Sequence, residues 1–336
     1  MKILLVQTSF LGDTILSTPV ISGIKKIFPE TELWMMTTPL SAELVIRDPL
    51  LAGVITDDKK DKNIGFAGIL RMKRRIQSIA FDRVYSLHRS PRTALLLWLC
   101  QIPVRIGFSD AKLSFLYHET RIRNRKDHDV IRNLSLLAGD ISIESLEPEL
   151  RLFPPEKNGL NENIRRTLPD TESYVVLVPG SAWKTKMWNW EGYHETARYL
   201  LKKSFYVVLL GTKSDEAVCK KVAQELNVTN LTGKTSIADT MYIIKNSRLV
   251  VCNDSMTLHL ASAFKIPNVA IFCATSPKSG FSPWRNNAIV VEKKDLSCKP
   301  CQRHGGKKCP TGTESCMKEL SHHEVIRAAD KLLNIK

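Results

Sequence analysis

The chain has 336 residues, of which 43% are hydrophobic, and its 49 lysines and arginines outnumber its 34 aspartates and glutamates, giving a formal charge of +15. This length and composition exclude a disordered chain and favour two folded domains. The positive charge predicts an anionic partner, for which nucleic acid, an acidic lipid surface and a phosphorylated glycan all qualify.

Apolar runs alternate with helical patterns throughout the first half of the chain, which predicts βαβ units and a parallel sheet. The expected strands lie near residues 3–6, 33–36, 84–87 and 104–106, and the expected helices near 14–28, 67–79, 91–100 and 130–138.

The alternation lapses between residues 147 and 170, where four prolines and Gly159 indicate an interdomain connection with one short helix. It then resumes, with strands expected near 174–178, 206–210, 249–252 and 269–272, and helices near 192–203, 215–226, 237–246, 257–264 and 322–333. We therefore predict an α/β protein with two Rossmann-like domains. The N-terminal domain covers residues 1–155, the C-terminal domain residues 156–320, and a final helix at 321–336 could pack back toward the N-terminal domain.

No segment resembles a membrane span or a secretion signal. The longest unbroken apolar run of the first half, Ala94 to Cys100, is far shorter than the roughly 20 residues that a spanning helix needs. Polar residues such as Gln7 and Asp13 interrupt the N-terminal run, which therefore lacks the apolar core of a signal peptide. We expect a cytoplasmic protein that could touch a membrane face.

The first strand ends in a polar segment, residues 7–13, that leads into a helical pattern. Ligands of open α/β sheets bind beyond the carboxyl ends of the strands, so Asp13 could hold a carboxylate within reach of a hydroxyl group that is to be deprotonated. The alternative is that Asp13 only caps the following helix. Neither half carries the glycine fingerprint of a dinucleotide fold or the Gly-Lys-Ser/Thr sequence of a P-loop.

Three strands of the second half also end in polar residues. The first is followed by residues 179–188, which offer small residues and two lysines, Lys184 and Lys186; the second by residues 211–216, whose acidic residues could cap a helix or bind ribose hydroxyls. The third ends at Asn253 and begins a helix that carries His259. Free N–H groups at such a helix start favour a phosphate, which predicts a diphosphate ligand.

Two further clusters have open interpretations. A predicted helix carries Arg71, Lys73, Arg74 and Arg75, which could recognise carboxylates and phosphates or form a solvated face. Asp127-His128-Asp129 matches the Asp-x-Asp pattern of metal-dependent sugar transferases, but it precedes a helix, so capping explains it better.

The chain contains eight cysteines, several of them inside apolar runs, which indicates reduced core thiols and not a disulfide framework. The four near the C-terminus could hold a structural zinc ion, although the second pair lacks the usual short spacing. Reduced thiols and labile disulfides are the alternatives for these four residues: Cys298, Cys301, Cys309 and Cys316.

The motifs together resemble the lipopolysaccharide heptosyltransferases, which have the GT-B fold and move heptose from ADP-heptose to the inner core on lipid A. The cysteine pattern is more similar to the second heptosyltransferase of that family than to the first. The matching segments are residues 4–13, Arg105-Ile106-Gly107-Phe108, Pro179-Gly180-Ser181 with Lys186-x-Trp188, Asn253-Asp254-Ser255 with His259, and the cysteine-rich tail.

The resemblance implies that Asp13 is the general base, that Lys186 neutralises the donor diphosphate, and that no cofactor is needed for catalysis. The implied donor-binding residues are Ser181, Ala182, Lys186, Gly211, Asp254, Ser255, Met256, Thr257 and His259. The implied acceptor-binding residues are Ser9, Gly12, Arg71, Arg74, Arg75 and Arg89. The implied acceptor is a lipid A–Kdo core reached at the cytoplasmic face of the inner membrane.

Two residues depart from the family pattern, because Met256 stands where glycine is usual and Lys213 where a related enzyme type has a ribose-binding acid. A transferase of the first or third heptosyltransferase type, using another nucleotide sugar or core hydroxyl, is therefore the main alternative. A basic nucleic-acid-binding protein is the alternative from another class, but its signature, a basic stripe with interleaved exposed aromatic residues, is not apparent in the sequence.

Overall fold

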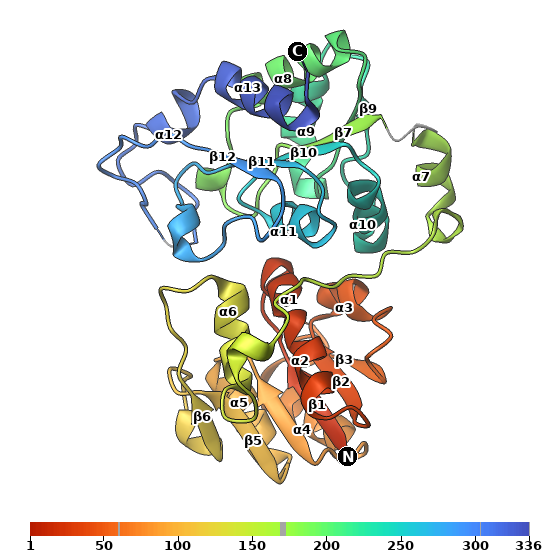
Figure 1. Ribbon diagram of the computed structural model, residues 1–336, viewed down its shortest axis with the longest axis vertical. Coiled ribbons are helices and arrows are strands. Elements are labelled where there is room, and N and C mark those ends of the chain that lie inside the picture. Colours follow the sequence, from red (N-terminus) through yellow and green to blue (C-terminus); the bar gives the residue numbers. More distant parts are fainter. Residues whose placement is uncertain (60, 169–172, 303, 336) are drawn as a thin grey trace. The chain divides into compact units, whose positions relative to one another are not determined.

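The computed structural model describes residues 1–59, 61–168, 173–302 and 304–335 (Figure 1). The chain forms two compact units, Met1–Phe153 and a second unit from Pro154 onward. The division falls two residues before the predicted boundary. No helix among the described residues has the length and apolar character needed to cross a bilayer.

The first unit is a six-stranded parallel sheet with helices between its strands. Its strands are β1 (Lys2–Val6), β2 (Glu32–Thr37), β3 (Gly53–Thr56), β4 (Arg83–Ser86), β5 (Val104–Phe108) and β6 (Glu119–Arg121). Its helices are α1 (Leu11–Ser17), α2 (Pro19–Ile27), α3 (Pro39–Val45), α4 (Gly65–Gln77), α5 (Pro91–Leu99) and α6 (Asp129–Leu134), with a short 3-10 turn, η1 (Ser114–Leu116). The helix expected at residues 14–28 is divided in two because Pro19, which has no N–H to donate, begins α2.

The second unit repeats this plan. Its strands are β7 (Tyr174–Val178), β8 (Tyr206–Leu209), β9 (Thr229–Asn230), β10 (Leu249–Asn253), β11 (Asn268–Ile271) and β12 (Ala288–Val291). Its helices are α7 (Glu162–Thr167), α8 (Trp190–Lys202), α9 (Glu216–Ala223), α10 (Ile237–Lys245), α11 (Met256–Ala263), α12 (Ser315–Lys318) and α13 (His322–Leu333). The strands β3, β6, β9 and β12 and the helices α3 and α12 were not predicted, because all six are short and β6 and β9 contain no apolar residue.

The two sheets share one strand order. The first runs β3-β2-β1-β4-β5-β6 and the second β12-β11-β10-β7-β8-β9, which is the same order counted along each half of the chain. In each sheet the order reverses between the first and the fourth strand, so the helices that follow these neighbouring strands cover opposite faces and leave a crevice at the carboxyl edge. This crevice lies beyond β1 and β4 in the first unit, and beyond β7 and β10 in the second.

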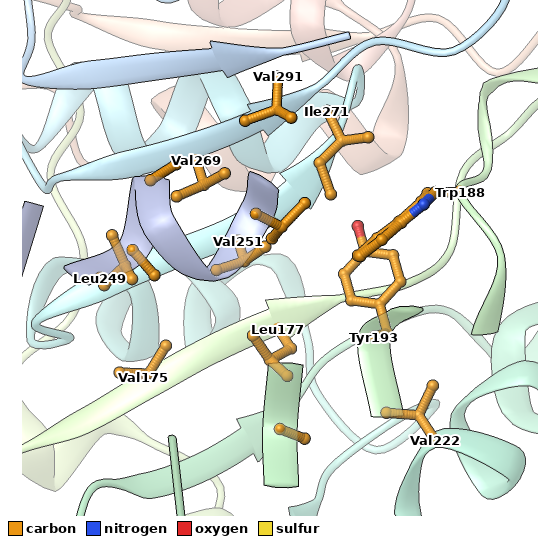
Figure 2. Close-up of a cluster of buried hydrophobic side chains, with 14 of the residues drawn as sticks. Val175, Leu177, Trp188, Tyr193, Val222, Leu249, Val251, Val269, Ile271 and Val291 are labelled. Carbon is orange, nitrogen blue, oxygen red and sulfur yellow. The ribbon is translucent and has the colours of Figure 1, made fainter. Parts of the chain in front are cut away.

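The core of the second unit lies between its sheet and the helices on one face (Figure 2). Trp188 is buried there against Tyr193, and its indole N–H donates to the backbone oxygen of Leu320, just before α13. Val325 and Leu332 of α13 pack into the same core. The C-terminal helix therefore packs on the second unit, because its apolar face completes this core. That it also turns back toward the first unit stays a prediction.

Gly192 in the first turn of α8 tests this packing. A Cβ atom at this position would lie 2.1 Å from Cζ2 of the Trp188 ring, which is rigid and fully buried. We expect Gly192→Ala to lower the free energy of unfolding by about 1–3 kcal/mol, because the overpacking outweighs the better helix propensity of alanine. Urea unfolding followed by tryptophan fluorescence measures the change. Arg198→Ala, on the exposed side of the same helix, should change it by less than about 0.5 kcal/mol; equal effects would contradict the packing argument.

Candidate active site

The first unit places Asp13 at the carboxyl edge of its sheet. Asp13 is the third residue of α1, and its Oδ2 accepts the backbone N–H of Phe10 at 3.2 Å, so it does help to cap the helix. Partial burial raises the pKa of this carboxyl to about 6, and the nearby charge of Asp129 acts in the same direction. The Phe10 N–H, Arg123 and Arg89 favour the ionised form and limit the rise. Asp13 thus titrates close to neutral pH, as a general base must.

Asp129 is a neighbour of Asp13 that sequence reasoning interpreted only as part of a cap. His128 does cap α6, accepting the N–H of Val130 at Nδ1. Asp129, however, is buried and paired with Arg123 and Arg132, and it accepts an amide N–H from Asn133 at 3.3 Å. The same Asn133 amide group donates to the backbone oxygen of Leu16 in α1, at 3.2 Å, which joins the helix of Asp129 to the helix of Asp13.

Two arginines complete this charged cluster. Arg89 follows β4 and bonds Asp110 at 2.8 Å. Its charge acts on Asp13, so this predicted acceptor residue lies at the same edge as Asp13, whose neighbours in the chain include Ser9 and Gly12. Arg123 was not predicted. Its side chain is buried, and its Nη1 has no hydrogen-bond partner among the described residues. A local signal for Arg123 is absent, because it lies in an irregular segment between β6 and α6.

A second polar network lies at the same edge, beyond β3. Nζ of Lys59 donates to Oγ1 of Thr8 at 2.6 Å, and Thr8 also bonds Nδ1 of His88 at 3.0 Å. Burial lowers the pKa of Lys59 to about 8 and that of His88 to about 3, so the imidazole is neutral. Sequence reasoning missed Lys59 because it missed β3, the strand that places it.

The arginines of α4 lie elsewhere. Arg71, Arg74 and Arg75 are exposed on the outer side of this helix, and the charged groups that act on Asp13 come from other elements. The structure therefore separates three of the predicted acceptor residues from Arg89.

In the second unit, Asn253 at the end of β10 fixes the loop that follows β7. Its side chain donates to the backbone oxygen of Pro179 at 2.8 Å and accepts the N–H of Trp188 at 3.0 Å. This loop holds Ser181, Ala182 and, in the 3-10 turn η5 (Lys184–Lys186), the lysine predicted to bind a diphosphate. Asn253 was expected only to end a strand, but its buried amide positions the whole loop.

Lys186 and Asp254 form the charged centre of this edge. Nζ of Lys186 lies 2.8 Å from Oδ2 of Asp254, and both side chains are largely buried. Oγ1 of Thr275 donates to the same carboxylate oxygen at 2.7 Å. The structure therefore brings together the ends of β7, β10 and β11, and Asp254 orients the lysine.

Helix α11 begins two residues after Asp254, with Ser255 at its N-cap position. Ser255 bonds Oγ1 of Thr257 at 2.8 Å and makes no capping hydrogen bond to the described residues, so the first N–H groups of the helix remain suited to an anion. Met256 adopts an ordinary helical backbone, and a side chain there requires no left-handed conformation. His259 is buried one turn later, with its ring 6.5 Å from that of Phe281.

The segment after β8 matches the capping interpretation. Oδ2 of Asp215 accepts the N–H and the hydroxyl group of Thr212 at 2.8 and 2.7 Å. A Cβ at Gly180 would lie 2.2 Å from Cγ of Asp215, and one at Gly211 would lie 3.0 Å from its Cβ. Because neither glycine has a side chain, the Asp215 side chain packs between the segments that follow β7 and β8. Gly211 therefore makes room for Asp215.

The cysteine-rich tail contacts the lysine loop. The N–H of Thr185 donates to the backbone oxygen of Gly306, whose own N–H donates to Oγ1 of Thr185 at 2.8 Å, and Gly305 lies against the Lys186 side chain. Its four cysteines are free thiols, and the described residues include no group of three or more His, Cys, Asp or Glu side chains that could hold a metal ion. A zinc site at these four positions stays a prediction from their spacing.

Replacing Asp129 should change the proton affinity of Asp13. Asp129→Asn removes a negative charge that opposes ionisation and leaves Arg123 in place, so the pKa of Asp13 should fall below about 6. Arg123→Gln should raise it. Carbon-13 NMR titration of the Asp13 carboxyl measures both shifts, and Asp127→Asn, a more exposed carboxyl of the same segment, is the control. A pKa that Asp129→Asn leaves unchanged would show that the two carboxyls do not interact.

Comparison with known proteins identifies relatives along the whole chain. The sequence profile of glycosyltransferase family 9 (heptosyltransferase) matches residues 69–310. The chain is 25% identical over 339 residues to lipooligosaccharide heptosyltransferase 2 of Campylobacter jejuni, covering 99% of each chain. It is 23% identical over 294 residues to lipopolysaccharide heptosyltransferase 2 of Escherichia coli, covering 82% of this chain and 84% of that one.

Solved structures share the fold. A family 9 glycosyltransferase from Veillonella parvula superimposes with a TM-score of 0.87 at 22% identity, covering 100% of this chain and 98% of the other. The ADP-heptose lipopolysaccharide heptosyltransferase II of E. coli superimposes with a TM-score of 0.81 at 22% identity, covering 99% of each. The two matching parallel sheets are those of the GT-B fold, and the family match spans well over half of the chain. The chain therefore belongs to glycosyltransferase family 9, the heptosyltransferases, and is a glycosyltransferase.

Proposed function

We propose that this chain moves a heptose, with inversion at the anomeric carbon, from ADP-heptose to the heptosyl-Kdo2-lipid A acceptor of the lipopolysaccharide inner core. The relatives named heptosyltransferase 2 support this step. Asp13 supports the proposal most directly, because it places a carboxylate with a pKa of about 6 at the carboxyl edge of the first sheet. A base of this kind accepts a proton at neutral pH and retains enough affinity to hold it.

In the proposed reaction Asp13 takes the proton of the acceptor hydroxyl as its oxygen attacks the anomeric carbon of the heptose. The bond from that carbon to the diphosphate breaks, and ADP leaves with the electron pair. Lys186, once it exchanges Asp254 for the diphosphate, and the first N–H groups of α11 supply the positive field for this charge. No metal or other cofactor takes part in this scheme. Arg89 and Arg123 provide guanidinium groups for the anionic acceptor.

A panel of donors and acceptors tests the assignment. ADP-heptose and other nucleotide sugars are each incubated with deacylated core acceptors that differ in their terminal sugar, and the products are read by mass spectrometry. Transfer of heptose from ADP-heptose to a heptosyl-Kdo acceptor supports the proposal. Transfer only from another nucleotide sugar, or only to an acceptor that lacks the first heptose, would favour a related family 9 reaction instead.

Because the proposed acceptor is a lipid, we propose that the chain works at a membrane surface, on the cytoplasmic side of the inner membrane. Contact with the membrane is therefore part of the proposal, and binding of nucleic acid is not.

Asp13→Asn should remove the general base while leaving the donor site intact. We expect turnover to fall by about 10²–10⁴-fold and the affinity for ADP, measured by calorimetry, to stay within about twofold. In the unchanged chain, kcat/KM should fall as the pH drops through about 6, because protonated Asp13 cannot accept a proton. Asp61→Asn, an exposed carboxyl of the same unit, is the control. Near-normal turnover of Asp13→Asn would remove this residue from the role.

Lys186→Ala should weaken ADP binding by about 10- to 100-fold, because a charge-assisted contact to the diphosphate is lost. Lys184→Ala, two residues earlier on the exposed side of the same turn, is the matched control and should bind ADP normally. Because Lys186→Ala also leaves Asp254 without its ion pair, the double variant with Asp254→Asn is measured too. If the double variant binds ADP as tightly as the unchanged chain, Lys186 serves only to neutralise Asp254.

A further inference from the structure

Large apolar side chains are unevenly exposed in this protein. Among the described residues, those exposed to solvent all lie in the first unit except Tyr206. Three of them project from the adjacent helices α4 and α5: Phe66, which is 63% exposed, Leu70, 37%, and Trp98, 47%. The 3-10 turn η1, which packs beside α5, adds Phe115 at 78%. A cluster of apolar groups that water surrounds usually marks an interaction site.

The same two helices carry cations and no acids. Neither α4 nor α5 contains an aspartate or glutamate, and between residues 62 and 109 the only acidic residue is Asp82. Helix α4 contributes Arg71, Lys73, Arg74 and Arg75. The sequence had not indicated a surface that combines basic and exposed aromatic residues, because Trp98 lies on a second helix that only the fold brings beside α4, and the exposure of Phe66 is seen only in the structure.

Helix geometry places these residues on one side. Phe66, Leu70 and Arg74 follow one another at intervals of four residues and are exposed, whereas Ile69 and Met72 of the same helix are buried. The outer sides of the two helices are continuous, since Lys73 of α4 and Trp98 of α5 line the same surface hollow. We call the outer surface formed by Phe66, Leu70, the four basic residues of α4 and Trp98 the basic-apolar face.

This combination fits the surface of an anionic bilayer. Lysines and arginines are attracted by the negative potential of acidic lipids, while tryptophan, phenylalanine and leucine insert their apolar bodies among the headgroups. Aliphatic Leu70 gives no stacking surface for a nucleic-acid base, which makes a single-stranded nucleic acid the poorer partner. A second copy of the chain would bring two equally basic faces together and is disfavoured by repulsion.

We propose that the basic-apolar face is the surface by which this protein docks on a bilayer containing anionic lipids. The arginines predicted to bind the acceptor sugar, Arg71, Arg74 and Arg75, then bind lipid headgroups instead. The end of the face that carries Phe66 lies close to the carboxyl edge of the first sheet, where Asp13 is found. Arg92 at the start of α5 pairs with Asp57 beyond β3 and donates to the backbone oxygen of Asn63, two residues before α4. If the proposed function holds, this arrangement presents the sheet edge of Asp13 beside the membrane that contains the lipid acceptor.

Flotation of the full chain with vesicles tests the proposal and needs no enzymatic activity or acceptor. Vesicles of phosphatidylcholine mixed with phosphatidylglycerol are compared with vesicles of phosphatidylcholine alone, at low and at physiological salt. We expect binding to the anionic vesicles only. The triple variant Arg71→Gln, Lys73→Gln, Arg74→Gln should bind them on the order of 100-fold more weakly, since each basic residue near the surface contributes roughly fivefold. Phe66→Ala with Trp98→Ala should lose the part of binding that persists at physiological salt.

A matched control distinguishes vesicle binding by this face from an effect of the protein's net charge. The triple variant Lys202→Gln, Lys220→Gln, Lys245→Gln removes the same charge from exposed helix positions of the second unit and should bind vesicles normally. Equal losses in both triple variants would overturn the proposal, as would unchanged binding of the α4 variant when circular dichroism shows it folded. Retention of a labelled RNA oligonucleotide at physiological salt that the α4 substitutions abolish, with no vesicle binding, would assign the face to nucleic acid. Because vesicle binding and heptose transfer are measured separately, either can fail without the other.

Discussion

The reversal of strand order in each parallel sheet is the constraint on which the rest of the structure depends. Strand β1 sits beside β4, and β7 beside β10, with the following helices on opposite faces of the sheet. Their carboxyl ends therefore meet at one edge of each sheet, and polar residues that follow the strands collect there. Asp13 reaches its position because β1 ends at Val6, and Lys186 reaches Asp254 because β7 and β10 are neighbours.

Both edges use paired charges to hold a reactive group in place. In the first unit the Asp129–Arg123 pair lies against the helix of Asp13. The charge of Asp129 raises the pKa of Asp13, and the charge of Arg123 lowers it. In the second unit Asp254 holds Lys186, and Thr275 holds Asp254. A buried charge that lacked such partners would cost several kcal/mol or lose its ionisation, so the pairing is what allows charged groups at these partly buried edges.

The segments outside the two sheets also act on these edges. The glycines of the tail, Gly305 and Gly306, hold the turn that carries Lys186, and α13 covers the core under Trp188. In the first unit, α4 and α5 bury one side against the sheet and leave a side that is basic and apolar at once. The amphipathic pattern of α4 thus serves two environments, the protein core and, in our proposal, a lipid surface.

Local sequence patterns were enough to predict the parallel α/β class, the division into two halves and the strand ends that carry Asp13, Lys186 and Asp254. These features are local, since they depend on apolar runs, turns and caps within a few residues of one another. Contacts made on folding, in contrast, bring Asp129, Arg123 and Lys59 to the first edge. They also let Asn253 fix the loop of Lys186 and pack α13 on the second unit. Each of these rests on a contact between residues far apart in the chain or on a strand too short to recognise. Neither strand pairing nor the burial of a charge can be read from local pattern, because both depend on which elements become neighbours after folding.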